Sequence, residues 1–296
     1  MGKTPDFPQT IFTELFIDGQ FVTGEGEAER VLNPATGEVL AEVREASYEQ
    51  IHKAVLGANR AFDSWSDTTP MERSRMLLKI ADAIEANATS FARLESLNCG
   101  KPYVRALEDE IPAIADCFRF FAGAARNVHG PVAGEYLPGH TSMIRRDPLG
   151  VVASIAPWNY PLMMAAWKLG PAIAMGNTVV LKPSENTPLT TLRFGELLAG
   201  ILPPGVVNIV CGRGDSVGAP LIRDPRIRVA SLTGDVSTGS KIMEAAARGI
   251  KRTHLELGGK APVIVCDDAN IADVVEGLRA FGYYNAGQDC TAACRI

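Results

Sequence analysis

One stretch of the chain decides the fold: residues 151–185 read VVASIAPWNYPLMMAAWKLGPAIAMGNTVVLKPSE. Two short β-branched runs, 151–157 and 177–183, enclose a helical stretch at 161–175. Continuous apolar runs are typical of strands that are covered on both faces, as in a parallel sheet. A strand, a helix and a second strand in this order predict a right-handed crossover unit.

The same alternation continues toward the C-terminus. Further β-branched runs and helical stretches follow one another at 188–202 (helix), 205–210, 215–223 (helix), 228–233, 238–247 (helix) and 261–266. We therefore predict an α/β fold with a doubly wound parallel sheet. Ligands of such sheets bind beyond the carboxyl ends of the strands, so the loops at those ends are the first place to look for a site.

The residues before this sheet predict hairpins and helices. Asp-Gly and Thr-Gly pairs interrupt alternating runs between residues 15 and 43, which favours small antiparallel hairpins at the edge of the protein. Apolar residues recur at helical spacing over 47–62, 70–97 and 108–125, with Pro70 suited to a first turn. A last helical pattern runs from Ile271 to Phe281.

Composition and charge exclude several classes of protein. Hydrophobic residues make up 46% and charged residues 21%, as in an ordinary globular chain. The net charge of −5 and the lack of a Lys/Arg-rich run argue against a nucleic-acid partner. The sequence has no apolar stretch long enough to cross a bilayer, no secretory signal and no disulfide rhythm among its cysteines. We expect a cytoplasmic protein without membrane partner or metal site.

Two glycine-rich loops compete for a phosphate. Residues 212–218 read GRGDSVG and residues 233–239 read TGDVSTG, each directly after a predicted strand. Neither matches the tight G-x-G-x-x-G pattern, and glycine also serves plain strand-to-helix turns. The second loop opens a helix, whose N-terminal amides can face an anion.

Four short motifs point to a particular chemistry: PWNYP at 157–161, LKPSE at 181–185, ELGGK at 256–260 and GQDC at 287–290. In this order they resemble the aldehyde dehydrogenase superfamily. The amino-acid sequence between the motifs is most similar to that of bacterial γ-aminobutyraldehyde dehydrogenases. The resemblance runs from about Leu15 to Ile296.

The resemblance implies a domain organisation and an assembly. A discontinuous NAD-binding domain would comprise residues 1–126 and 148–256, with a β-hairpin oligomerisation arm at 127–147 and the start of an α/β catalytic domain at 257–296. Members of the family are homo-oligomers, dimers or tetramers. The later family motif E-x-F-G-P does not occur here, so we expect a C-terminally truncated chain whose assembly is open.

The resemblance also assigns catalytic residues. Cys290, directly after Gly-Gln-Asp, matches the nucleophile, whereas Cys294 has no such match and is expected to serve packing. Asn159 matches the side-chain donor to an oxyanion, and Glu256 matches the base that activates water. A free thiol is only a few per cent ionised at pH 7, so Cys290 needs an activating site. Without the family, Asn159 would be a turn residue and Glu256 a solvated one.

NAD is the implied cofactor. Lys182 and Glu185 match the contacts to the adenosine ribose, and a carboxylate there disfavours the 2′-phosphate of NADP. Further cofactor contacts are expected from Pro157, Trp158, Gly234, Asp235, Gly239 and Gly258. Asp235 stands where the family usually has Ser, which places a negative charge beside a pyrophosphate and predicts weakened NAD affinity.

The substrate is less closely defined. Tyr160 and Trp167 suit an aromatic wall around a cationic chain, and Glu110 is a candidate for an ammonium group unless it lies on a solvated face. These residues favour an ω-aminoaldehyde such as 4-aminobutanal, oxidised to its acid through a thiohemiacetal and a thioester. The alternatives are a non-catalytic fragment, at most a dinucleotide-binding module, and an acylating enzyme that uses coenzyme A, which Glu256 disfavours.

Overall fold

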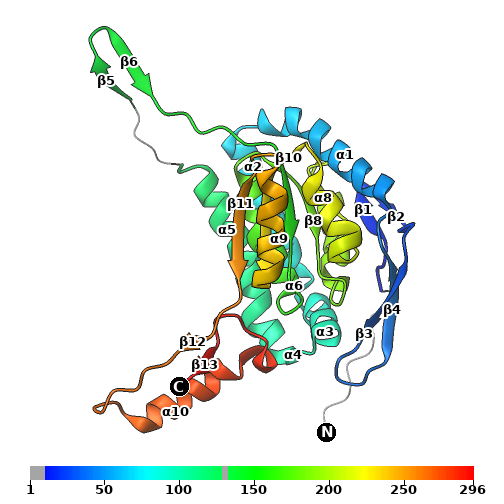
Figure 1. Ribbon diagram of the computed structural model, residues 1–296, viewed down its shortest axis with the longest axis vertical. Helices are drawn as coiled ribbons and strands as arrows, with labels where there is room; N and C mark the ends of the chain where they lie inside the picture. The colour runs from blue at the N-terminus through cyan, green and yellow to red at the C-terminus, as the bar shows by residue number, and fades with distance from the viewer. Residues whose placement is uncertain (1–10, 129–132) are drawn as a thin grey trace.

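A central sheet organises the molecule. The computed structural model describes residues 11–128 and 133–296. Figure 1 shows the sheet with helices on both faces, a hairpin that projects from this body, and a C-terminal segment that extends from the other end. The sheet has the strand order β11-β10-β7-β8-β9-β1-β2. Its strands are β1 Leu15–Ile17, β2 Gln20–Val22, β7 Val151–Ile155, β8 Thr178–Lys182, β9 Val207–Ile209, β10 Ile227–Gly234 and β11 Arg252–Leu257.

The five strands from β7 to β11 are parallel and doubly wound. The chain passes from β7 through β8 to β9 in one direction, then returns to the other side of β7 for β10 and β11. The predicted α/β fold class is confirmed. Because the direction of winding reverses between β7 and β10, the loops leaving these two strands diverge and leave a crevice at their carboxyl ends.

Helices cover the sheet, and α1, α2, α9 and α10 begin at side-chain caps. They are α1 Tyr48–Ser66, α2 Pro70–Ala86, α3 Ala88–Cys99, α4 Tyr103–Arg105, α5 Ile111–Ala125, α6 Pro161–Ala174, α7 Leu189–Ala199, α8 Ala219–Arg223, α9 Val236–Ala247 and α10 Ile271–Gly282. Short π-helical segments occupy Ala106–Glu110 and Gly214–Gly218. Ser47 and Thr69 form capping boxes at the starts of α1 and α2, and Pro70 takes the predicted first-turn position.

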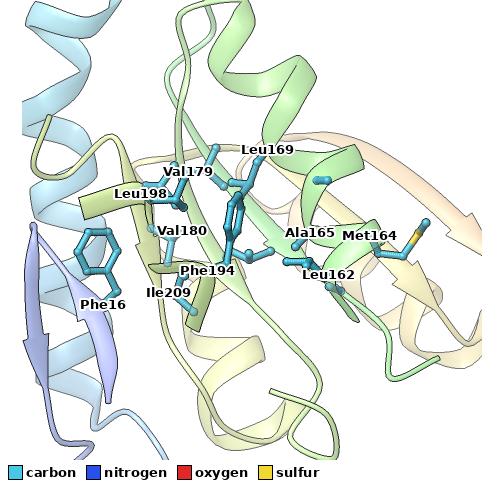
Figure 2. Packing of buried hydrophobic residues seen from close by; sticks show 14 of the residues in the cluster. Phe16, Leu162, Met164, Ala165, Leu169, Val179, Val180, Phe194, Leu198 and Ile209 are labelled. Atoms are coloured by element: carbon cyan, nitrogen blue, oxygen red, sulfur yellow. The ribbon is translucent and has the colours of Figure 1, made fainter. Parts of the chain in front are cut away.

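The core lies between the sheet and its helices. Every residue of β8 is buried, as is most of β7, which explains why their sequences are continuous apolar runs. Figure 2 shows part of this cluster, including Phe194 of α7, Leu169 of α6 and Val180 of β8. The carboxyl ends of the strands therefore project from a rigidly packed frame.

The predicted N-terminal hairpins are confirmed. β1 and β2 pair antiparallel around a turn in which Asp18 and Gly19 have φ of 53° and 78°. β1 also pairs antiparallel with β9 and so closes one edge of the sheet. A second hairpin joins β3 Ala28–Leu32 to β4 Val39–Arg44.

The prediction for the last strand of the sheet is wrong. The apolar run 261–266 contributes only the two-residue β12, Ala261–Pro262, outside the main sheet, and Ile264 is 85% exposed. The edge position belongs instead to β11, whose sequence RTHLEL alternates polar and apolar residues. An edge strand needs no continuous apolar run because part of its surface faces solvent.

Two segments leave the main body. β5 Ala133–Leu137 and β6 His140–Met143 form the projecting antiparallel hairpin (Figure 1). The rest of the predicted arm 127–147 includes residues 129–132, which lie outside the described residues, as do residues 1–10 of the predicted first domain. At the C-terminus, β12 and β13 Ala293–Arg295 are parallel and joined through α10, a further β-α-β unit. The domain boundaries given above stay predictions.

Candidate active site

A cavity of about 500 Å³ opens where the parallel strands end. Its walls come from the loop after β7, the ends of β8 and β10, the start of α9, the end of β11 and the turn before Cys290. It is lined by most of the residues singled out in the sequence: Pro157, Trp158, Asn159, Tyr160, Lys182, Glu185, Gly234, Asp235, Glu256, Gly258 and Cys290. Residues far apart in the chain thus meet at the crevice.

A larger cavity of about 1280 Å³ lies next to the first. The two share wall residues, among them Lys182, Glu185, Gly214 and Thr238. The loop at 212–218 lines mainly the larger cavity, and the loop at 233–239 lines mainly the smaller one. Both glycine-rich loops therefore border a space long enough for an extended ligand.

Asn159 is held between the sheet and the C-terminal segment. Its Nδ2 donates to the carbonyl oxygen of Gln288 at 3.0 Å. In return, Nδ2 of Asn285 donates to the carbonyl oxygens of Asn159 at 2.9 Å and of Gln288 at 3.0 Å. A side-chain amide has two N–H donors, so the contact to Gln288 leaves one N–H of Asn159 for a ligand.

A left-handed turn brings the chain back to this point after α10. Asn285, Ala286 and Gly287 have φ of 51°, 57° and 79°. Asn and Gly tolerate this region, whereas Ala carries strain there. Asn285 is buried and makes the two hydrogen bonds just described, which offset the cost of the turn. The turn therefore delivers Cys290 to the cavity.

Cys290 is exposed and predominantly a neutral thiol. Partial burial, then the carboxylates of Asp289 and Glu256, raise the pKa of Cys290 above its ordinary value. Glu256 lies beside Thr233 of the neighbouring strand, at the end of the sheet where the cavity opens. Its carboxylate and the Cys290 thiol therefore line the same cavity. The thiol thus needs a base to take its proton, and a carboxylate stands in the same cavity.

The two residues predicted to contact the cofactor ribose lie at the end of β8 and in the loop after it. Lys182 is buried at the end of β8, where its Nζ donates to the carbonyl oxygens of Gly212 at 2.5 Å and Pro183 at 3.0 Å. The carboxylate of Glu185 lies 3.4 Å from the same Nζ and is partly exposed to the cavities. Nζ thus has its hydrogen bonds inside the protein, while Glu185 can accept from a ligand.

Asp235 caps α9 at the cavity wall. Its Oδ1 accepts from the backbone N–H of Ser237 at 2.7 Å, and hydrogen bonding first to the side chain and then to the backbone of Ser237 lowers the pKa of Asp235. A fixed negative charge therefore stands at a helix N-terminus whose amides would otherwise favour an anion.

Two of the sequence-predicted residues do not reach the cavities. Gly239 is buried in α9, and a Cβ placed there would lie 2.9 Å from Cδ2 of Leu257. Its role is to let the helix pack closely on β11. Trp167 is 56% exposed on α6 and lines neither cavity, because the inward face of that helix is taken by residues such as Leu169.

Glu110 and Cys294 are also placed differently from the expectation. Glu110 is neither solvated nor open to a ligand, because it is buried in an ion pair with Lys101. Cys294 is exposed on β13 rather than packed, and its Sγ donates to the carbonyl oxygen of Ala292 at 2.9 Å. The short strand β13 buries few of its side chains. The packing role predicted for Cys294 is therefore wrong.

Sequence reasoning missed several residues of the site. Lys168 is buried behind it, with Nζ 3.0 Å from Oγ of Ser231, and burial lowers the pKa of Lys168 to about 8 although Glu256 opposes this. A lone Lys within the apolar helix 161–175 was the available signal. Asn285, Gln288 and Asp289 act through backbone and side-chain contacts to Asn159 and Tyr160, and no spacing rule predicts such contacts.

Metal and membrane features are absent from the part of the chain that the structure describes. There, His, Cys, Asp and Glu side chains form no group of three that could hold a metal ion. No helix within residues 11–128 and 133–296 combines the length and apolar character needed to cross a bilayer.

The fold and the cavity together define an α/β protein that binds its ligand at the carboxyl edge of a doubly wound sheet. The sequence model of the aldehyde dehydrogenase family matches residues 21–296. The chain therefore belongs to the aldehyde dehydrogenase family.

Several proteins that are similar to this chain in sequence or structure are named as aldehyde dehydrogenases. A mitochondrial aldehyde dehydrogenase of Leishmania tarentolae is 43% identical over 290 residues, covering 96% of this chain and 57% of the relative. A betaine aldehyde dehydrogenase of Bacillus subtilis is 42% identical over 287 residues, covering 95% and 58%. The solved NAD+ complex of betaine aldehyde dehydrogenase from Staphylococcus aureus matches with a TM-score of 0.93 at 38% identity, covering 96% and 57%. The chain thus spans a little over half the length of these relatives.

Proposed function

We propose that this site oxidises an aldehyde to a carboxylic acid with NAD. The observation that carries the proposal is a single cavity lined by a thiol, an amide donor and a carboxylate: Cys290, Asn159 and Glu256. A nucleophile, a donor for the oxyanion and a base are the three groups that thiol-based acyl chemistry requires.

The residues present fit NAD. The adjoining cavities of about 500 and 1280 Å³ provide room for a dinucleotide, and Glu185 presents a carboxylate to both. Glu185, beside the internally bonded Lys182, would hold the ribose, and the loop from Gly234 to the start of α9 would face the pyrophosphate. Related chains are described as NAD+ complexes, including the aldehyde dehydrogenase of Bacillus cereus. When bound, NAD supplies the acceptor for the hydride that leaves the substrate carbon.

Cys290 and Asn159 perform the first half of the reaction. The Glu256 carboxylate takes the proton of the Cys290 thiol and passes it to solvent, the sulfur adds to the aldehyde carbon, and the carbonyl oxygen becomes an oxyanion. The N–H of Asn159 that Gln288 does not use, together with the backbone N–H of Cys290, would donate to that oxyanion. Each such donor contributes about 10²–10³ in rate.

Glu256 performs the second half. After loss of the hydride, the Cys290 sulfur carries a thioester. The Glu256 carboxylate takes a proton from water, the resulting hydroxide adds to the thioester carbon, and the acid leaves as the sulfur departs. The glycines after Glu256 leave open space, since no heavy atom lies within 4 Å of a Cβ built at Gly258 or Gly259.

The substrate is proposed to be an ω-aminoaldehyde such as 4-aminobutanal. Of the two aromatic residues predicted to contact the substrate, Tyr160 lines the cavity and Trp167 does not, and an aromatic ring suits a cationic chain. Similarity to betaine aldehyde dehydrogenases supports a cationic substrate, while the phenylacetaldehyde dehydrogenase of Pseudomonas fluorescens, 41% identical, represents the competing aromatic class.

The projecting hairpin and the cysteines bear on the assembly and the location of the protein. The projecting hairpin exposes Tyr136, Leu137 and Met143, which favours a homo-oligomeric contact through this arm. All six cysteines are free, as in a cytoplasmic protein.

A second candidate function follows from length. Because the chain spans little more than half of its relatives, it would by itself be a dinucleotide-binding module without turnover.

One experiment tests both candidates. NAD affinity is measured by titration calorimetry, and NADH formation with 4-aminobutanal by absorbance, for the wild type, Cys290→Ser and Cys294→Ser. NADH formation that is lost in Cys290→Ser and kept in Cys294→Ser supports the oxidation. NAD binding without NADH formation supports the module. Failure of the wild type to bind NAD would overturn both.

A further inference from the structure

A buried charge cluster lies beneath the loop that carries Asn159. Glu95, Lys101 and Glu110 are only 1%, 3% and 5% exposed. Nζ of Lys101 lies 2.5 Å from Oε2 of Glu110 and 3.2 Å from Oε1 of Glu95. Glu95 comes from α3, Lys101 from the turn after it, and Glu110 from the segment before α5. One ammonium therefore faces two carboxylates in the interior.

The charges of this cluster do not balance unless one carboxyl keeps its proton. Oε2 of Glu95 and Oε1 of Glu110 are buried without a hydrogen-bond partner among the described residues. A proton between the two carboxyl groups satisfies both oxygens and leaves a cluster with no net charge, which burial strongly favours. Burial, then the charge of Glu95, raise the pKa of Glu110 to about 8.

The cluster touches the chain just after Asn159, and a neighbouring cysteine contacts Asn159 itself. Nζ of Lys101 lies 4.8 Å from the ring centroid of Tyr160. Oε1 of Glu95 accepts from the backbone N–H of Leu162 at 3.4 Å, one of the N–H groups that the first turn of α6 leaves without a helical partner. Cys99, on the same helix as Glu95, donates from Sγ to the carbonyl oxygen of Asn159 at 3.2 Å.

We propose that Glu95, Lys101 and Glu110 are positioning residues for the Asn159 loop, and that one proton shared by the two carboxyl groups keeps the loop in place. The importance given to Asn159 rests on the proposed function, but the placement of the loop does not. Loss of the proton leaves two buried carboxylates facing the single ammonium of Lys101 beside Tyr160. The carboxylates then separate, and Glu95 withdraws from Leu162.

The other titratable groups around Glu110 stay neutral over the relevant pH range. They face it from three elements: Cys99 of α3, Tyr160 of the loop after β7, and Tyr284 of the C-terminal segment. Burial raises the pKa of Cys99 to about 12 and that of both tyrosines above their ordinary value. Asp109 lies further out, where it accepts from Tyr284 and pairs with Arg105. The carboxyl pair of Glu95 and Glu110 is therefore the group that loses a proton near pH 8.

Hydrogen–deuterium exchange of residues 157–162 tests the proposal on this chain, without cofactor or substrate. It compares the wild type with Glu110→Gln and Glu95→Gln between pH 6.5 and 9.5, each pair at the same pH. A Gln amide supplies a permanent N–H in place of the shared proton. Asp116→Asn, an exposed carboxylate on α5, is the matched control.

We expect equal exchange at pH 6.5, and above pH 8 an acceleration of the wild type by up to about tenfold per pH unit that both Gln variants lack. Asp116→Asn should follow the wild type, and exchange in β8 should be unchanged throughout. If the wild type and either folded Gln variant keep the same exchange ratio at every pH, the proposal is wrong. Two variants keep the test decisive if one of them does not fold. Because NAD and aldehyde are absent, the result is independent of whether the oxidation occurs.

Discussion

The parallel sheet and the segment that follows it contribute to the same cavity but are held in different ways. β7 and β8 are buried nearly throughout, and their loops present Asn159, Lys182 and Glu185. Helix α10 contains no buried residue, and Phe281 on it is 69% exposed. Cys290 follows that helix. The cavity thus has a cofactor side, with the residues proposed to bind NAD, on a packed frame, and a nucleophile side, with the proposed nucleophile Cys290, on a segment that buries little.

This difference shows how the nucleophile side is placed. Instead of apolar packing, a few directional contacts attach it, chiefly from Asn285 and Gln288 to Asn159 and Cys99. A hydroxyl contact from Tyr160 to Asp289 at 3.2 Å adds to them. Hydrogen bonds fix geometry well but contribute about 1 kcal/mol each, so this side should open more easily than the frame.

The largest expected effect separates the two regions by stability. Phe194→Ala removes a fully buried ring from the frame and should lower the free energy of unfolding by about 3–5 kcal/mol. Phe281→Ala removes an exposed ring from α10 and should change it by less than about 0.5 kcal/mol. Urea unfolding followed by circular dichroism measures both. A loss of several kcal/mol in Phe281→Ala would mean that α10 is packed against the frame after all.

The second largest effect is expected from a substitution that removes contacts between the nucleophile side and the frame. Asn285→Ala removes both hydrogen bonds to the carbonyls of Asn159 and Gln288 and places Ala at a positive φ. We expect local opening to become easier by about 2–3 kcal/mol. Hydrogen–deuterium exchange should accelerate both at 285–291 and at 157–160.

Asn270→Ala is the comparison variant for this prediction. Asn270 caps α10, where its Oδ1 accepts from the N–H of Ala272 at 3.0 Å, but it does not reach the frame. Its loss should cost about 1 kcal/mol and accelerate exchange in α10 alone. If Asn285→Ala also accelerated exchange in α10 alone, the hydrogen bond from Asn285 to Asn159 would not hold the two regions together.

A smaller effect concerns the thiol. Asp289→Asn removes a negative charge beside Cys290, so the pKa of Cys290 should fall and more thiolate should be present at pH 7.5. The rate of alkylation by iodoacetamide, followed for the Cys290 peptide by mass spectrometry, should rise about two- to fivefold. Asp268→Asn, an exposed carboxylate on the same segment, should leave the rate unchanged. An equal increase in both variants would point to net charge rather than to this contact.

The smallest effect lies on the cofactor side. Asp235→Ser and Asp235→Asn both keep a good N-cap for α9 while removing its charge. NAD should bind about two- to fivefold more tightly to each, and the thiol should alkylate at the wild-type rate. Titration calorimetry gives the dissociation constant. An unchanged constant in both variants would show that Asp235 does not repel the pyrophosphate.

The frame was largely predictable because its strands are buried on both faces, so β7, β8, β9 and β10 stand out as apolar runs. β11 was missed for the complementary reason, since an edge strand alternates. The motifs located Asn159, Glu256 and Cys290 because their chemistry constrains short stretches of sequence. Trp167 and Gly239 were assigned to the ligand from pattern alone, and packing on α6 and against Leu257 gives them other places.

By itself, the sequence determined the α/β alternation and the positions of most strands in the sheet, and its resemblance to a family predicted the groups that the chemistry needs. These depend on periodicity and on residue type, which are local properties. Only the tertiary structure decided that Asn285 holds the turn before Cys290, that Asp289 and Glu256 act on its thiol, and that Glu110 is buried with Lys101 and Glu95 rather than open to a ligand. The physical reason is that hydrogen bonding, burial and charge interaction depend on distance in space, which separation along the chain does not fix.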